Sequence, residues 1–381
     1  MRVAYFTESL YPLVDGVSRT LDRLFGTLEQ RGVDFLVFSP FVPEPGVAWR
    51  ERVRKTAFIH FPPYPDYRVS IPRIASYRQA LEEFEPDLIH VVSPTPLAYR
   101  AQSLAIDMGV PVVASFHTHF VSYFRFYGIG RFESLGWSLL RRFYERCARV
   151  YVPSESIIRE LREHGMRNLE LWSRGIDLSG YSPARRDRAF LLERYGVSAD
   201  EPVLLLVSRL VKEKDLRDLI AVDRELKARG VRYRFALVGE GPLRPTLERA
   251  LPDAIFAGHQ AGPDLARWYA SSDVFIFPST TETLGNVVLE ALASGIPAVV
   301  VDRGGPQDLI RYGSNGYIAH ANDIGDIARH LQMLLQDEGM RRRMGEAGRA
   351  SASSRKWEEI NDGLLDSYRR VIETGKTEGR G

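Results

Sequence analysis

Short apolar runs alternate with helical patterns along the whole chain, and this alternation restricts the fold more than any other feature of the sequence. The runs are rich in β-branched residues and apolar on both faces, as is typical of parallel strands buried beneath helices. Repeated β-α-β units of this kind predict doubly wound sheets and an α/β fold class. The expected strands are Val3–Thr7, Phe35–Ser39, Phe58–Phe61, Leu88–Val92, Val112–Phe116, Val150–Pro153, Val203–Ser208, Tyr233–Val238, Ile255–Ala257, Val274–Phe277 and Ala298–Val301.

The length of 381 residues exceeds one ordinary domain and fits two. A break is expected within Asp177–Asp187, a polar stretch that contains Gly and Pro. We therefore expect two Rossmann-like domains with a ligand cleft between them, at the carboxyl ends of the strands. The tail from Thr374 to Gly381 is expected to be disordered.

The composition excludes several classes of protein. With 44% hydrophobic and 26% charged residues the chain is typical of soluble globular proteins, and its net charge of +2 is too small to indicate nucleic acid as the main partner. The single cysteine, Cys147, excludes an internal disulfide and a Cys-based metal site, which favours a reducing cytoplasm. The N-terminus lacks a signal-peptide apolar segment, and no apolar run reaches 18 residues, so no membrane span is expected.

One stretch, Pro278–Gly295, carries two glutamates eight positions apart, Glu282 and Glu290. We expect a strand to end near Pro278 and a helix to start near Asn286. The free N–H groups and positive dipole end of such a helix favour a phosphate, and the two glutamates are placed to contact opposite ends of its ligand. A capped helix with two surface acids explains the same pattern when it stands alone.

Two motifs in the first half also follow predicted strands. Gly16 opens an expected helix at Val17–Gln30, and a glycine there lets a ligand approach backbone N–H groups, although a plain strand-to-helix turn has the same sequence. In the second motif, His117 and His119 follow the predicted strand Val112–Phe116. Strand alternation predicts that both side chains point to one side. No third metal-binding side chain lies nearby in the sequence, so a polar or catalytic role is favoured over a metal site.

In the second half, Arg209 and Lys214 follow a strand and suit a diphosphate, although a charged loop is often merely solvated. The segment Val238–Arg244 begins like G-x-G-x-x-G, but Arg244 replaces the third glycine, so the dinucleotide fingerprint fails. No two aspartates lie two positions apart, so no D-x-D pair is present to hold a divalent metal on a diphosphate. Arg209, Lys214 and the helix N-terminus must then neutralise its charge, and neither metal nor cofactor is expected.

The segment from Tyr123 to Cys147 is both aromatic and basic. Helical spacing predicts a helix there whose apolar residues face the core and whose outer face is basic. The loop before it is suited to contact anionic lipid or a lipid acceptor. The apolar residues at helical spacing are Phe132, Leu135, Leu139, Leu140 and Phe143.

Taken in order, these motifs resemble those of retaining glycosyltransferases of family 4, which have the GT-B fold. The resemblance covers the chain to about Arg370 and is carried by P-x-x-D-G-V, S-F-H-T-H, the R-x4-K of Arg209 and Lys214, V-G-E-G-P-L-R and E-T-L-G-N-V-V-L-E. Pro12–Val17 and Trp172–Asp177 further resemble the branch with GDP-mannose-dependent α-mannosyltransferases and sulfoquinovosyl- or glycosyl-diacylglycerol synthases. The resemblance implies an acceptor-side domain at residues 1–178, onto which a final helix at residues 357–372 crosses back, and a nucleotide-sugar-binding domain at residues 179–356.

The resemblance also implies roles for single residues. Glu282 holds hydroxyls of the donor sugar, Glu290 binds the ribose, and Arg209 and Lys214 neutralise the leaving diphosphate. His117 contacts the sugar or assists its departure. The remaining donor-binding residues are Gly16, Thr283, Leu284, Gly285 and Asn286, and the acceptor-side residues are Asp15, His119 and Tyr123. Leu284 and Asn286 depart from the commonest family residues, and because both act through their backbone, the departure bears on donor preference.

The expected activity is metal-independent transfer of a mannose- or glucose-type hexose, with retention, from a nucleotide sugar such as GDP-mannose or UDP-glucose to an acceptor hydroxyl. The resemblance favours a membrane glycolipid or diacylglycerol as acceptor. It implies a cytoplasmic protein associated with the inner face of the membrane, where an anionic surface is a further partner. The alternatives are a nucleotide-sugar epimerase of related fold, a transferase with a soluble acceptor, and a non-catalytic nucleotide-sugar-binding subunit.

Overall fold

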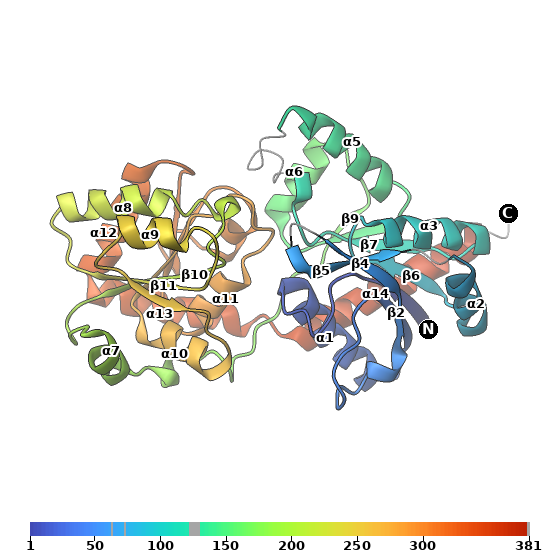
Figure 1. Ribbon diagram of the computed structural model, residues 1–381, viewed down its shortest axis with the longest axis horizontal. Helices are drawn as coiled ribbons and strands as arrows, with labels where there is room; N and C mark the ends of the chain where they lie inside the picture. Colours follow the sequence, from blue (N-terminus) through green and yellow to red (C-terminus); the bar gives the residue numbers. More distant parts are fainter. Residues whose placement is uncertain (62–63, 72–73, 122–129, 379–381) are drawn as a thin grey trace. The chain divides into compact units, whose positions relative to one another are not determined.

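The computed structural model describes residues 1–61, 64–71, 74–121 and 130–378 (Figure 1). They form two compact units. The first contains Met1–Val121, Arg131–Arg174 and the segment from Trp357 onward, and the second contains Gly175–Lys356. Within the described residues, no helix combines the length and the apolar composition needed to cross a bilayer.

The first unit is built on a seven-stranded parallel sheet with the strand order β3-β2-β1-β6-β7-β8-β9. A separate antiparallel pair, β4 and β5, accompanies it. The strands are β1 (Arg2–Phe6), β2 (Asp34–Ser39), β3 (Val53–Lys55), β4 (Ala57–Phe61), β5 (Tyr64–Ile71), β6 (Leu88–Val91), β7 (Val112–Ser115), β8 (Arg149–Val152) and β9 (Leu169–Leu171).

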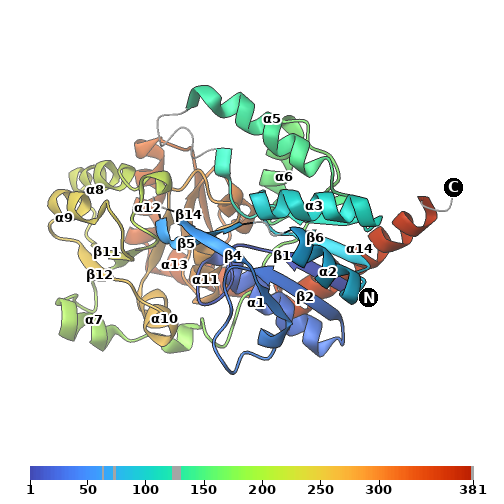
Figure 2. The ribbon, with the colours of Figure 1, turned by 45° about the vertical axis from the view of Figure 1, so that its right-hand side comes forward.

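Helices cover both faces of this sheet. Alternate strand residues pack into two separate apolar clusters, one with α2, α3, α5 and α6, and the other with α1 and α14. Figure 2 shows α14 running along the first unit toward the C-terminus. The helices are α1 (Gly16–Gln30), α2 (Ile74–Phe84), α3 (Pro96–Met108), α5 (Glu133–Tyr144), α6 (Glu155–Glu163) and α14 (Trp357–Glu378), with short 3-10 turns η1 (Arg50–Arg52) and η2 (Gly130–Phe132).

The second unit is a six-stranded parallel sheet with the order β12-β11-β10-β13-β14-β15 around one apolar core. Its strands are β10 (Val203–Val207), β11 (Arg234–Val238), β12 (Ile255–Gly258), β13 (Val274–Phe277), β14 (Ala298–Val301) and β15 (Gly316–Ala319). Its helices are α7 (Arg188–Tyr195), α8 (Asp218–Ala228), α9 (Arg244–Ala250), α10 (Gly262–Ser271), α11 (Asn286–Ala293), α12 (Ile324–Gln336) and α13 (Glu338–Ser353), with 3-10 turns η3 (Pro183–Arg185), η4 (Lys212–Lys214) and η5 (Gly305–Leu309).

All eleven predicted runs contain strands, but Phe58–Phe61 is not part of a parallel sheet. It lies in β4, which pairs antiparallel with β5. Four strands were not predicted: β3, β5, β9 and β15. Three of them are only three or four residues long, and β5 contains a proline and an aspartate, so none shows the long apolar run that marks a buried strand.

Two local expectations are wrong. Helix α14 continues to Glu378, so the tail is helical through most of the part expected to be disordered. The expectation for α5 is wrong for three of its five apolar residues: Phe132 at the N-cap, Leu135 and Leu139 are exposed, with 43%, 55% and 53% of their surface accessible. Leu140 and Phe143 are buried as predicted, on a face that they share with Gly136, Trp137 and Tyr144. Apolar residues occur around most of this helix, so their spacing alone does not identify the core side.

A buried polar network joins α14 to the sheet of the first unit. The Nδ1 atom of His90 lies 2.5 Å from the hydroxyl of Tyr368, and its Nε2 atom lies 3.0 Å from the hydroxyl of Ser115. All three side chains are buried, and burial lowers the pKa of His90 to about 3. The ring is therefore neutral in the folded protein at neutral pH.

This network predicts how the stability of the first unit depends on pH. The unfolded chain protonates His90 near pH 6.5, whereas the folded chain resists protonation until about pH 3, so stability is complete above pH 6.5 and is lost progressively below it. We expect His90→Gln to flatten the fall in unfolding temperature between about pH 7 and pH 4.5, as measured by calorimetry. The exposed His60 provides the matched control, because His60→Gln should retain the wild-type slope. Equal slopes for His90→Gln and wild type would contradict the assignment.

Candidate functional site

The second unit places its candidate site where the strand order reverses, between β10 and β13. In doubly wound sheets the loops that follow the two strands at such a point diverge and leave room for a ligand. The loop after β10 carries Arg209 and Lys214, and the loop after β13 carries Glu282. The topology therefore brings three predicted site residues to one edge of one sheet.

Helix α11 begins directly after the second of these loops, at Asn286, as predicted. Its N-cap residue, Gly285, has a left-handed backbone with φ of +90°, which favours glycine. Because glycine has no side chain to cap the helix, the N-cap residue offers the first N–H groups of α11 no side-chain acceptor. These groups and the helix dipole favour an anion at this end of α11.

Two hydroxyl side chains tie the loop after β13 to the loop after β10. Asp215 Oδ2 accepts hydrogen bonds from the backbone N–H of Thr280, at 2.9 Å, and from its hydroxyl, at 2.7 Å. The hydroxyl of Thr281 donates to the backbone carbonyl of Glu213, at 2.8 Å. These bonds fix the position of Thr280 and Thr281, and hence of the following residue Glu282, relative to the loop after β10.

Lys214 and Glu282 form an ion pair with an Nζ–Oε2 distance of 2.6 Å. Burial raises the pKa of the Glu282 carboxyl, but the charge of Lys214 and its hydrogen bond outweigh burial and hold that pKa below its usual value. Arg209 adds a weaker attraction to Glu282 and lies 3.7 Å from Glu213, with most of its side chain exposed. The site thus pairs each of its two cations with a carboxylate, Lys214 with Glu282 and Arg209 with Glu213, and the side chain of Arg209 remains accessible.

Glycines allow the loops to pack closely against one another. A Cβ atom on Gly305 would lie 2.0 Å from the carbonyl oxygen of Thr283, and one on Gly304 would lie 2.7 Å from that of Glu282. A Cβ on Gly239 would lie 1.9 Å from the carbonyl oxygen of Ser208. The glycines of the Val238–Arg244 motif are therefore explained by close packing against the loop after β10.

Glu290 lies inside α11 and is only 6% exposed. The hydroxyl of Tyr269, a fully buried residue of α10, donates to Glu290 Oε2 at 2.8 Å. This hydrogen bond holds the carboxylate in one orientation. Thr283 and Leu284, which precede the helix, are buried as well, so these three predicted donor-binding residues are packed into the second unit.

In the first unit, His117 follows the end of β7. It contacts two residues at the end of the segment Arg131–Arg174. Its Nδ1 atom lies 2.7 Å from Nη2 of Arg174, and its ring meets that of Trp172 edge-on at 5.8 Å. Burial, together with the charge of Arg174 and the proximity of His90, holds the pKa of His117 well below its usual value. His117 is therefore neutral at neutral pH.

His119 does not share these neighbours. Its Nε2 atom lies 2.8 Å from Oε1 of Glu160 in α6, and its ring lies edge-on to Phe116 and Trp137. The alternation argument that pointed both histidines to one side is wrong, because β7 already ends at Ser115. Tyr123, the third predicted acceptor-side residue, lies outside the described residues.

Asp15 and Gly16 start helix α1. Asp15 Oδ1 accepts hydrogen bonds from the backbone N–H groups of Val17 and Ser18, and Ser9 Oγ lies 2.7 Å from both oxygens of the Asp15 carboxylate. Asp15 thus acts as the N-cap of a capping box, and Gly16 is the first helical residue. This helix start follows β1, where the strand order of the first unit reverses.

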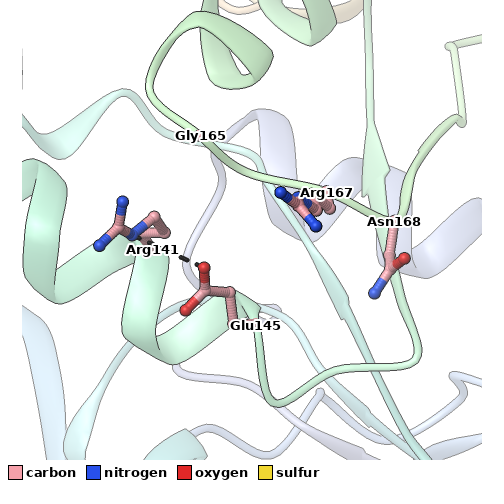
Figure 3. Close-up of a pocket in the computed structure, with 5 residues that line it drawn as sticks. All are labelled: Arg141, Glu145, Gly165, Arg167 and Asn168. Carbon is pink, nitrogen blue, oxygen red and sulfur yellow. Dashed lines mark ion pairs between the residues drawn. The ribbon is translucent and has the colours of Figure 1, made fainter.

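A polar surface hollow of about 550 Å³ lies elsewhere in the first unit (Figure 3). It is lined by Arg141, Glu145, Gly165, Arg167 and Asn168, and none of the predicted site residues is among them. The side chains of Arg141 and Glu145 pair across part of it at 3.6 Å. Among the described residues, no group of three or more His, Cys, Asp or Glu side chains is arranged to hold a metal ion.

The geometry adds residues that the sequence patterns did not single out, namely Asp215, Tyr269, Gly304 and Gly305. It also gives a contact to Arg174, which the sequence marked only as part of the Trp172–Asp177 motif. Each acts through a partner that is distant in sequence. For the two glycines the local signal was their doubling after β14, which indicates a tight turn or a close approach.

Two family models match most of the chain. The model described as Glycosyltransferase Family 4 matches residues 14–179, and the model described as Glycosyl transferases group 1 matches residues 187–351.

A GDP-mannose-dependent alpha-mannosyltransferase of Mycolicibacterium smegmatis is 33% identical over 378 residues, which cover 98% of this chain and 98% of that protein. An alpha-monoglucosyldiacylglycerol synthase of Streptococcus pneumoniae is 25% identical over 312 residues, which cover 78% of this chain and 70% of the synthase. The solved structure of Anabaena Alr3699/HepE in complex with UDP has a TM-score of 0.77 and 19% identity, and the match covers 97% of this chain and 100% of that chain. Together with the two parallel sheets, this structural likeness confirms the predicted α/β class with two Rossmann-like halves.

Proposed function

Because this chain belongs to glycosyltransferase family 4 and is a hexosyltransferase that uses a nucleotide-sugar donor, we propose that it transfers a mannose- or glucose-type hexose to a lipid acceptor with retention of the anomeric configuration. The observation that carries the proposal is the arrangement around α11. An uncapped helix N-terminus, an accessible arginine, and a lysine paired with a carboxylate converge at one strand-order reversal. Such an arrangement suits a sugar attached to a diphosphate.

The donor roles follow from the chemistry of each group. The diphosphate binds the amides of Leu284, Gly285 and Asn286, just before and at the start of α11, and is neutralised by Arg209 and Lys214. Glu282 accepts hydrogen bonds from hydroxyls of the sugar. Glu290 accepts from the ribose, in the orientation that Tyr269 gives it. The mannosyltransferase relative supports GDP-mannose as the donor, and UDP-glucose is the alternative.

In this proposal no metal ion takes part in neutralising the diphosphate. The support is the missing D-x-D pair together with the two cations beside α11. The acceptor hydroxyl attacks the anomeric carbon on the face from which the diphosphate departs, the bond between that carbon and the diphosphate oxygen breaks, and the departing oxygen takes the acceptor proton. His117 contacts the sugar, and Gly16 lets the start of α1 approach the donor.

A lipid acceptor is supported by the diacylglycerol synthase relative and by the surface of α5. Phe132, Leu135 and Leu139 form one exposed apolar stripe, and the exposed Arg142 continues the same helix face. Apolar residues beside arginines suit the headgroup region of an anionic bilayer. We therefore place the protein at a membrane surface, held by α5.

The first prediction concerns the reaction. With GDP-mannose or UDP-glucose, we expect nucleotide release only when a diacylglycerol or monoglycosyl-diacylglycerol is added, and the rate should not change with EDTA. The product linkage, measured by NMR, should have the anomeric configuration of the donor. Release without an acceptor would indicate an epimerase or hydrolase instead, acceptor-dependent release only with water-soluble sugars would exclude the lipid, and tight binding without turnover would indicate a binding protein.

The second prediction separates two donor residues. Lys214→Ala should lower kcat by about 100-fold or more, because charge on the diphosphate grows in the transition state. Glu290→Gln should instead raise the donor KM by about tenfold and leave kcat nearly unchanged, because ribose contacts are equal in the ground and transition states. Steady-state kinetics at saturating acceptor measure both. If the two variants showed the same kinetic pattern, the separate roles would be wrong.

The third prediction concerns the membrane. The double change Leu135→Gln and Leu139→Gln should weaken flotation with liposomes containing anionic lipid by about tenfold, because two exposed leucines no longer insert. Wild-type binding should also fall as salt is raised. Leu192→Gln is the matched control, since Leu192 is a leucine of α7 that is similarly exposed, and it should bind like wild type. Absence of wild-type binding at low salt would exclude α5 as a membrane contact.

A further inference from the structure

Arg174 is the last residue of the first unit's second segment, and its guanidinium group is buried. Nη1 donates to the backbone carbonyls of Trp172 and Ser173, at 2.8 and 3.0 Å. The group lies over the ring of Trp172, with Cζ 4.7 Å from the ring centre, and Nη2 points to His117. The partners of the Arg174 guanidinium within the described residues are thus carbonyls and rings, and none of these is a carboxylate.

The contact between Arg174 and His117 fixes which nitrogen of the histidine carries the proton. A guanidinium has only donors, so at 2.7 Å the Nδ1 atom of His117 must accept with its lone pair. A neutral imidazole whose Nδ1 accepts has its proton on Nε2. His117 is thereby a hydrogen-bond donor at Nε2.

The charges around His117 keep it in that state. Burial lowers its pKa, and the two titratable groups that act on it, Arg174 and His90, both lower it further. Burial also lowers the pKa of Arg174, to about 9, which leaves the guanidinium charged at neutral pH. Protonation of His117 would place two cations in contact, so the neutral ring persists.

We infer that Arg174 is a positioning residue that holds His117 as the Nε2–H tautomer, so that His117 acts on the substrate as a fixed donor to an oxygen atom and not as a base. This inference rests on the proposed function for the identity of the substrate oxygen, but the tautomer is a property of the resting protein. The bond also joins the end of β7 to the residue at which the chain leaves the first unit.

A role in packing alone would explain the burial of Arg174 but would not fix the tautomer. Nitrogen-15 NMR of protein labelled in histidine separates the two accounts, because protonated and unprotonated ring nitrogens have distinct shifts. The His117 signals are assigned from their loss in His117→Gln. In the wild-type protein we expect a protonated Nε2 and an unprotonated Nδ1 from pH 8 down to pH 5.5.

Two variants then test the role of Arg174. Arg174→Gln removes the charge, so the His117 pKa should rise toward its ordinary value, and kcat should fall about 10- to 100-fold with little change in donor KM. Arg174→Lys retains a charged donor and should recover much of both properties. Arg349→Gln is the matched control, because Arg349 likewise donates to backbone carbonyls, in its case those of Leu178, Tyr181 and Ala293. That variant should lower stability without moving the His117 signals.

Each outcome decides the inference. A protonated Nδ1 in the wild-type protein would overturn it without any variant, and so would unchanged His117 shifts in a folded Arg174→Gln protein. Unchanged shifts in Arg174→Lys with a restored kcat support it. If the protein transfers no hexose at all, the proposed function fails, while the tautomer measurement still stands or falls by itself.

Discussion

The structure of the candidate site depends on one set of contacts between the loops after β10 and β13. Three consecutive residues of the first loop, Glu213, Lys214 and Asp215, hold three consecutive residues of the second, Thr280, Thr281 and Glu282. The second loop leads directly into α11, so these contacts hold the segment that precedes the start of the helix. Lys214 is therefore both a part of the loop contact and a cation of the site.

The sequence predicted the sheets well because their strands are buried on both faces. Where apolar runs alternate with helical patterns, a run such as Leu204–Leu206 is explained best as a buried strand. The prediction failed for three of the edge strands, β3, β9 and β15, which pair with only one neighbour and are three or four residues long. It also failed for the face of α5, because Trp137 and Leu139 are both apolar and only the tertiary packing selects which is buried.

For the site, the sequence indicated positions better than interactions. The spacing of Glu282 and Glu290 correctly located a helix start between them, because local preferences of Gly285 and Asn286 determine it. The partners of these acids could not be inferred, since Tyr269 belongs to another helix and no local pattern connects it to Glu290. The same holds for Arg174, whose contact with His117 joins residues that are 57 positions apart in the chain.

The two units hold their polar groups in complementary states. In the second unit, the attraction of Lys214 keeps the Glu282 carboxyl ionised, so it can only accept hydrogen bonds. In the first unit, Arg174 leaves His117 only its Nε2–H to offer, so it can only donate. A sugar hydroxyl both donates and accepts, and so is suited to either kind of group. In the function proposed above, the diphosphate competes with Glu282 for the charge of Lys214, so donor binding weakens the ion pair that the resting protein contains. The Glu282 carboxylate then accepts hydrogen bonds from hydroxyls of the same ligand, which couples recognition of the sugar to recognition of its diphosphate.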